Sequence, residues 1–117
     1  MNEKNLKKAG IDCLAGIRRF SGSADLYEKY LKKFTDDENF KLAKKAMEEK
    51  NYEDVLKYIH TLKGVTGNLS MTELFDSCSE LVTVIRNKDL NGVDEIFHKI
   101  CLLHSKVCEA IHIENEN

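Results

Sequence analysis

The sequence predicts an all-α fold, an antiparallel up-down four-helix bundle with an additional short N-terminal helix. The 117 residues contain no proline and only a few localised glycines, so little interrupts long helices. Apolar residues recur at helical spacing along four long segments, with polar residues on the opposite side. Such segments bury their apolar stripes against one another, and short connectors make neighbouring helices antiparallel.

The first helical segment is predicted from about Asp12, which can serve as its N-cap, to Phe20. Its apolar positions at helical spacing are Ile11, Leu14 and Ile17. The segment ends at Ser21 and Gly22. We expect residues 1–9 to form an N-terminal tail or a short helix.

A second apolar pattern begins after Ser23, which can cap a helix. The pattern pauses at a polar patch over 35–38 and then resumes. The apolar positions on either side of the patch are Leu26, Tyr30, Leu31, Phe34, Phe40, Leu42, Ala43, Ala46 and Met47. This pattern is compatible with one long helix or with two.

Three more helices complete the bundle, which we place over residues 10–112. Asn51 can cap the first of them, and the segment from Ser70 to Glu73 reads as a capping box that opens the second, which ends near Asn87. Asp89 or Asn91 is expected to cap the last helix, whose apolar positions are Ile96, Ile100, Leu103, Val107 and Ile111. We expect residues 113–117 to form a frayed C-terminal tail.

Composition and charge narrow the function. The net charge is −2 and no basic stripe is interleaved with aromatic residues, so a nucleic-acid partner is not expected. The first ten residues are charged and no apolar stretch is long enough to span a bilayer, so we expect a cytoplasmic protein without a membrane partner. We also expect it to be a monomer. The four cysteines lie within apolar-periodic segments, which favours reduced core residues over disulfides.

A helical wheel separates the two faces of the segment 51–69. Val55, Ile59, Leu62, Thr66 and Leu69 fall within about 40° of one direction, which is the core. His60 falls about 140° from that direction, Gly64 about 180° and Gly67 about 120°. His60 is therefore expected to face water, with both glycines on its side of the helix.

The two glycines need an explanation, because glycine inside a helix costs about 1 kcal/mol relative to alanine. We interpret them as giving access: His60 stands above bare backbone at Gly64 and Gly67, where another protein can bring a reacting group close. A solvated imidazole is largely unprotonated, and therefore nucleophilic, at neutral pH. Lys63, one turn on, adds a positive charge within reach of a phosphoryl group bound to the ring.

The segment His60-Thr61-Leu62-Lys63-Gly64-x-x-Gly67-Asn68-Leu69 resembles the signature of the histidine phosphotransfer (HPt) family, H-x-L-K-G-x-x-x-N-L. The resemblance extends upstream to Gly10-Ile11-Asp12, Arg19-Phe20, Leu26-Tyr27 and Leu31 to Phe34, and it covers residues 10–112. One departure is Ser70-Met71, where the family often has glycine and alanine.

The resemblance implies that His60 is the phosphoacceptor, that Lys63 stabilises the phosphoryl group and that Gly64 keeps the docking surface clear. It implies a phosphocarrier without autonomous catalytic activity, which takes a phosphoryl group from a receiver aspartate or a sensor histidine kinase and passes it to another receiver in a two-component phosphorelay. Few acidic groups lie near His60, so no cofactor is expected and any Mg²⁺ is expected to come from the partner receiver domain. We expect Arg86, on the following helix, to reach the same rim.

Two other interpretations remain open. One is a helical interaction module that docks to receiver domains without transferring phosphate, although the retained pair of His60 and Lys63 argues against it. The other is a metal-binding bundle, because Cys101, His104, Cys108 and His112 lie along one stripe of the last helix and suit zinc. A single straight helix seldom closes a tetrahedron of metal ligands, so packing at the core edge is favoured there.

A histidine kinase is excluded, because the sequence has no glycine-rich nucleotide loop and no room for an ATP-binding domain.

Overall fold

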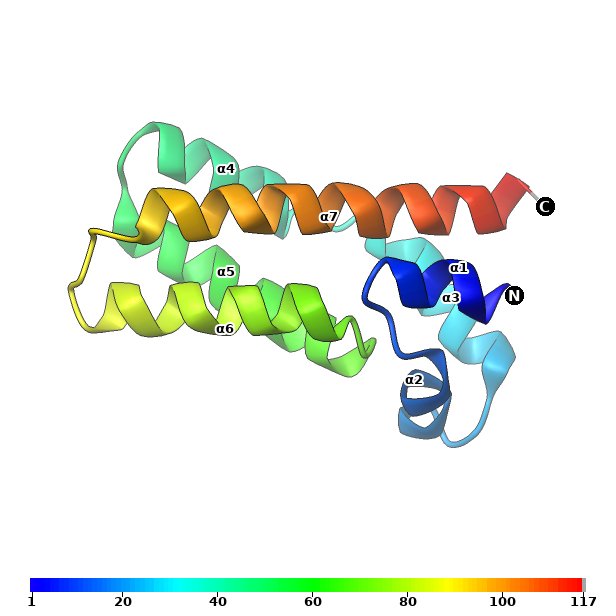
Figure 1. The fold of residues 1–117 in the computed structure, drawn as a ribbon. Helices are drawn as coiled ribbons and strands as arrows, with labels where there is room; N and C mark the ends of the chain where they lie inside the picture. The colour runs from blue at the N-terminus through cyan, green and yellow to red at the C-terminus, as the bar shows by residue number, and fades with distance from the viewer. Residues whose placement is uncertain (117) are drawn as a thin grey trace.

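The computed structural model describes the backbone of residues 1–116 and the side chains of residues 1–114. Within this range the chain consists of helices joined by short connectors (Figure 1). The helices are α1 (Glu3–Lys8), α2 (Cys13–Arg19), α3 (Ala24–Phe34), α4 (Asn39–Glu48), α5 (Tyr52–Asn68), α6 (Thr72–Arg86) and α7 (Val93–Glu116). The prediction of an all-α fold is confirmed.

Helices α4, α5, α6 and α7 form the four-helix bundle, and consecutive helices run in opposite directions (Figure 1). Helix α5 packs against both α4 and α6, and α6 packs against α7. The long helix α7 continues past this bundle and contacts α1 and α3. Helices α1, α2 and α3 therefore gather at one end of the bundle, where α7 also ends (Figure 1).

The second apolar pattern forms two helices, α3 and α4, and polar side chains explain the break between them. The Asp37 carboxylate accepts hydrogen bonds from the backbone N–H and the side-chain amide of Asn39, both at 2.9 Å. The Thr35 hydroxyl donates to the Lys32 carbonyl at 2.8 Å. Local bonds of this kind give the backbone an alternative to the helical ladder, so the polar patch ends one helix and starts another.

The segment between α1 and α2 is attached to the turn between α5 and α6. Asp12 is the N-cap of α2, as predicted, and its side chain accepts a hydrogen bond from the Ala15 N–H at 3.1 Å. The Asp12 N–H donates to the Ser70 carbonyl at 2.8 Å. The Thr72 hydroxyl donates to the Gly10 carbonyl at 3.1 Å. Both ends of the α5–α6 turn are thus hydrogen-bonded to the N-terminal segment.

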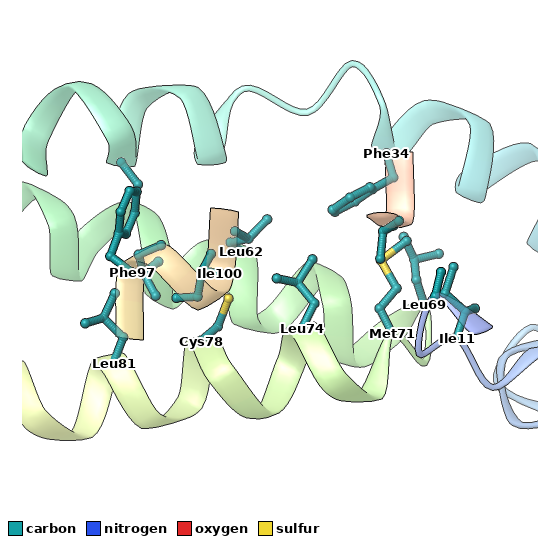
Figure 2. Packing of buried hydrophobic residues seen from close by; sticks show 14 of the residues in the cluster. Ile11, Phe34, Leu62, Leu69, Met71, Leu74, Cys78, Leu81, Phe97 and Ile100 are labelled. Carbon is teal, nitrogen blue, oxygen red and sulfur yellow. The ribbon is translucent and has the colours of Figure 1, made fainter. Parts of the chain in front are cut away.

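The core is a continuous column of buried apolar side chains along the bundle axis (Figure 2). On α5 the buried residues are the ones that the helical wheel predicts: Val55, Ile59, Leu62 and Thr66, followed by Leu69 at the helix end. They pack with buried residues of α6 and α7 that include Leu74, Cys78, Leu81, Phe97 and Ile100. Burying one large aliphatic side chain contributes about 1.5–3 kcal/mol, so this stripe fixes the rotation of α5 about its own axis.

The turn between α5 and α6 differs from the sequence prediction. Met71, not Ser70, occupies the N-cap position of α6, and no side chain caps the helix. Ser70 instead follows the end of α5, with a positive φ of 56°. The Met71 N–H donates to the Thr66 carbonyl at 2.9 Å and the Ser70 N–H to the Gly67 carbonyl at 3.2 Å, which is a Schellman motif. The predicted capping box is wrong because Ser70 terminates one helix and does not begin the next.

The start of α7 also differs from the prediction that Asp89 or Asn91 caps it. The Ile96 N–H donates to the Gly92 carbonyl at 3.1 Å, so Gly92 holds the position before the helix that begins at Val93. The Asp89 carboxylate accepts from the Asn91 N–H at 3.2 Å, within the connector. The aspartate therefore stabilises the turn and not the helix end.

At its other end α7 continues to Glu116, although we expected a frayed tail from residue 113. The Glu114 carboxylate accepts hydrogen bonds from the Asn2 N–H at 2.9 Å and from the Asn5 side-chain amide at 3.3 Å. The last turns of the helix are thus tied to α1. The final residue of the expected tail, Asn117, lies outside the described residues.

Candidate functional site

His60 lies in the middle of α5 and is exposed. Its neighbours in sequence point elsewhere: Ile59 and Leu62 are fully buried in the core. Because the burial of those side chains fixes the rotation of α5, the imidazole is held on the outer surface of the bundle. This is the orientation that the helical wheel predicts.

The surface beside His60 is open at Gly64, because no side chain stands there. A Cβ added at Gly64 meets no atom within 4 Å, apart from the backbone of its own helix. The glycine is therefore not required by packing inside this chain. Its missing side chain leaves open space one helical turn from the imidazole, so a partner can approach the ring along this side.

Gly67 has a different local role. A Cβ at this position lies 3.2 Å from Cδ2 and Cε2 of the Phe75 ring, which belongs to α6. This distance is tighter than an ordinary van der Waals contact, so glycine lets the ring lie close against the backbone of α5. The sequence interpretation assigned Gly67 to access alone, and packing against Phe75 is a second reason for it.

Lys63 is half-buried at the edge between α5 and α6. Its Nζ atom lies over the Phe75 ring, 5.9 Å from the ring centroid, which is within the range of a cation–π contact. Among the described side chains, an ion pair forms between Lys32 and Glu28, and none involves Lys63. The Lys63 ammonium is therefore not neutralised by a carboxylate of the described chain.

Arg86 lies in the last turn of α6 and is exposed. Helices α5 and α6 are antiparallel and Gly67 lies against Phe75, so His60 is level with about residue 82 of α6. Arg86 is then one helical turn beyond the level of His60, roughly 6 Å along the axis. Within the described residues, the structure shows no hydrogen bond or ion pair between the two side chains.

Phe75 is the residue of this site that the sequence analysis missed. It is half-buried, and it follows Leu74 of the core stripe. In the sequence it is marked only by a glycine near the end of one predicted helix and an aromatic residue near the start of the next. A helical wheel gives the direction of a side chain but not its neighbour, so that signal could not be used without the structure.

The C-terminal end of α5 is hydrogen-bonded to Tyr27 of α3. The Tyr27 ring is fully buried, and its hydroxyl donates to the Leu69 carbonyl at 2.6 Å. Burial raises the pKa of Tyr27, so the hydroxyl stays protonated and keeps its role as a donor. Gly16 of α2 makes this arrangement possible, because a Cβ there would collide with the Tyr27 ring.

The stripe of cysteine and histidine residues on α7 forms part of the core edge. The His104 ring stacks on Phe40 of α4, with ring centroids 4.0 Å apart. The Cys108 sulfur lies 3.8 Å from the nearer nitrogen of His104, and His112 is exposed. Within residues 1–114, no three or more His, Cys, Asp or Glu side chains are grouped so that they could hold a metal ion.

All four cysteines are free. Cys13 and Cys78 are buried, and Cys101 and Cys108 are half-buried. Burial raises the pKa of Cys78 to about 12, so its thiol stays protonated at neutral pH and is a poor nucleophile. These residues act as small apolar side chains of the core and its edge.

A hollow of about 500 Å³ opens on the other flank of α5, beside Val65 and Asn68. Phe20, which follows α2, and two aromatic residues of α3 line it, together with Arg19 and Lys33. His60 does not line it. The imidazole stands on an open helical surface and not inside this hollow, which suits contact with a macromolecule better than capture of a small substrate.

The fold and this site define a helical-bundle module that presents one histidine on an open face of its second bundle helix. A family model described as Hpt domain matches residues 27–112, which include all of α4, α5 and α6 and most of α3 and α7. The chain belongs to the Hpt domain family, and the resemblance drawn from the sequence is confirmed over residues 27–112. Members of this family are phosphocarrier modules for histidine phosphotransfer in two-component systems. Comparisons with curated proteins and with solved structures yield no match.

A search of the described helices for a membrane span gives a negative result. None of them combines the length and the apolar character that crossing a bilayer requires.

Proposed function

We propose that this protein accepts a phosphoryl group on His60 from the phospho-aspartate of a receiver domain or from a sensor histidine kinase, and passes it to the aspartate of another receiver. The observation that carries this proposal is the exposed imidazole beside open space at Gly64. Family membership supports the reaction class, and the open surface supports docking of a protein partner.

In the transfer step, the unprotonated ring nitrogen of His60 attacks the phosphorus of the aspartyl phosphate. The N–P bond forms as the P–O bond to the aspartate breaks, and the aspartate leaves as a carboxylate. The other ring nitrogen carries the N–H and releases its proton to solvent. The reverse sequence on a second receiver regenerates the free imidazole. Such transfers pass through a loose, in-line transition state, so positioning and charge stabilisation account for most of the protein's contribution.

Two cations of this chain suit the charge that develops on the phosphoryl oxygens. Lys63 is three residues from His60, on the same side of α5, and has no carboxylate partner among the described residues. We assign it the main stabilising role. Arg86, one turn beyond on α6, is exposed and is assigned a secondary role at the rim of the docking surface.

The chain acts as a phosphocarrier without autonomous catalysis in this proposal, and it works as a monomer. Mg²⁺ is assigned to the partner receiver domain, because the described side chains group no set of three potential metal ligands. The exposed patch around His60 then serves two partners in turn, one that donates the phosphoryl group and one that accepts it.

The test is to mix the purified protein with a receiver domain carrying a radiolabelled phospho-aspartate and to follow the label. Wild-type protein is expected to become labelled, and His60→Gln is expected to stay unlabelled. Because His60 is exposed, the substitution should change the free energy of unfolding by no more than about 0.5 kcal/mol, which a denaturant titration checks. Label on the folded His60→Gln protein would refute the assignment, and a receiver that binds without any transfer would instead support a non-transferring interaction module.

A further inference from the structure

The proposed reaction assigns a role to Lys63 but none to Phe75, which contacts it. Lys63 extends from α5 and Phe75 from α6, and the ammonium lies 5.9 Å from the ring centroid. Phe75 is half-buried, so one part of its ring packs on the bundle and the rest is open to the Lys63 side chain. A lysine on a helix surface ordinarily samples many rotamers, and a cation–π contact reduces that freedom.

The position of the ring is determined by Gly67. The ring carbons Cδ2 and Cε2 lie 3.2 Å from the place where a Cβ of Gly67 would be. On the wheel of α5 the direction of Gly67 is about 20° from that of His60, whereas Lys63 projects about 60° from it. A ring seated against Gly67 therefore lies on the side of α5 that carries His60, about 10 Å further along the helix axis, and the contact keeps the Lys63 ammonium on that side.

We propose that Phe75 is a positioning residue for phosphoryl transfer, which holds the Lys63 ammonium on the His60 side of the α5–α6 edge, and that Gly67 provides the seat for its ring. This inference rests on the proposed function of His60. The ring does not touch the reacting atoms. It keeps the cation preorganised, so that less side-chain freedom is lost when the charged phosphoryl group arrives.

The ring also suits a cation that must interact with an incoming phosphoryl group. A cation–π contact at a partly exposed site is weak, whereas an ammonium and a phosphoryl group attract each other as full charges. The ammonium can therefore bind the phosphoryl group while the Lys63 side chain stays beside the ring. A carboxylate in the place of Phe75 would compete with the phosphoryl group for the same charge.

The experiment compares transfer rates from one phosphorylated receiver to wild-type protein, Phe75→Leu and Phe75→Tyr. Phe75→Leu keeps an apolar side chain but removes the ring, and we expect a rate about two- to fivefold lower, the equivalent of one exposed cation–π contact. Phe75→Tyr keeps the ring and is expected to restore the wild-type rate. Phe40→Leu, which alters another half-buried phenylalanine packed on α7, is the matched control and is expected to transfer at the wild-type rate.

The decisive comparison is made in a Lys63→Met background. If Phe75 acts through Lys63, then adding Phe75→Leu to Lys63→Met lowers the rate no further. A purely structural role would give the same further loss with or without Lys63. In parallel, the side-chain methylene protons of Lys63 next to Nζ are expected to show a ring-current NMR shift in wild-type protein that Phe75→Leu abolishes.

Each result decides one question. Transfer to wild-type protein establishes the proposed function, and its absence there removes both ideas together. With wild-type transfer in hand, an unchanged or increased rate in Phe75→Leu overturns the positioning role alone. An equal loss in the Lys63→Met background, or in Phe40→Leu, also overturns it.

Discussion

At Gly64 the absence of a side chain is explained by nothing inside the molecule, since a Cβ there meets no neighbour within 4 Å. We therefore predict that Gly64→Leu blocks phosphoryl transfer by filling the space beside His60. The fold should be retained or stabilised by up to about 1 kcal/mol, because leucine favours the helix more than glycine does. Transfer assays and thermal unfolding on the same preparation check both parts.

Ser105→Leu supplies the control for this prediction, because it adds a leucine at an exposed position of α7. Its transfer rate should equal that of the wild type. A wild-type rate in Gly64→Leu would mean that the partner does not approach His60 across this part of α5.

The outward direction of His60 was predictable because it depends on one helix only. Four buried residues of α5 define its core direction, and the position of His60 relative to them follows from helical geometry. The reason for Gly67 was not predictable in the same way. It depends on which residue of α6 lies opposite, and a contact between two helices is set by their register, which no single wheel contains.

At the scale of the elements, the end of α5 carries a residue in a costly conformation. Ser70 has a φ of 56°, in the left-handed region that glycine adopts at little cost. We predict that Ser70→Gly raises the free energy of unfolding by about 1 kcal/mol. Denaturant titration of the two proteins measures the difference.

Lys50→Gly is a matched control for Ser70→Gly, because Lys50 follows the end of α4 with a φ of 55°. A gain of similar size is expected there. If Ser70→Gly is neutral or destabilising while Lys50→Gly stabilises, the buried Ser70 side chain makes a contribution that outweighs its backbone cost.

The contact between α4 and α7 should depend on pH. His104 stacks on Phe40, and its burial lowers the pKa of His104 from the ordinary 6.5, while Asp37 acts in the opposite direction. The unfolded chain then takes up a proton at a pH where the folded chain does not. We predict that the free energy of unfolding falls as the pH drops below 6.5 until the lowered pKa is passed.

The variant His104→Phe keeps an aromatic ring against Phe40 but cannot titrate. Its unfolding free energy should vary less with pH in this window than that of the wild type, with the other ionisable groups common to both proteins. Parallel curves for the two proteins would show that His104 does not contribute to the pH dependence.

Helix bodies were predictable and helix ends were less so. The apolar stripes give the extent of α5, α6 and α7 because burial of each stripe is a property of the whole segment. At the ends, a few polar groups compete for the same backbone donors. Ser70 had the residue type of a cap but is hydrogen-bonded into the preceding turn, and Gly92 took the position expected for Asn91.

At the scale of the whole molecule, one buried hydrogen bond joins α3 to the end of the helix that carries His60. The Tyr27 hydroxyl donates to the Leu69 carbonyl at 2.6 Å, with the ring fully buried. We predict that Tyr27→Phe lowers the free energy of unfolding by about 1–3 kcal/mol, because the carbonyl is left without its donor. Equilibrium denaturation at neutral pH measures the change.

Tyr30→Phe is the control, since Tyr30 lies one turn further along α3 and is 41% exposed. Its free energy of unfolding should stay within about 0.5 kcal/mol of the wild-type value. Equal effects of the two substitutions would mean that the bond from Tyr27 to Leu69 contributes little.

The bundle topology was predictable from stripes and connector lengths, because antiparallel packing of consecutive helices is the short-range solution for such a chain. The packing of the N-terminal helices was not. It depends on Gly16 against Tyr27 and on Asp12 against Ser70, pairs separated by many residues. Nothing in the local sequence around either partner marks the other.

The hydrogen bonds between residues 10–12 and the α5–α6 turn bear on where the folding unit of this protein begins. The family match starts at Tyr27, yet the Asp12 N–H and the Gly10 carbonyl, both upstream of that point, are hydrogen-bonded to Ser70 and Thr72 at the turn that follows α5. A fragment that starts at Tyr27 would keep His60 and Lys63 but would lose these hydrogen bonds. We therefore expect the autonomous folding unit to begin upstream of the residues that the family model matches.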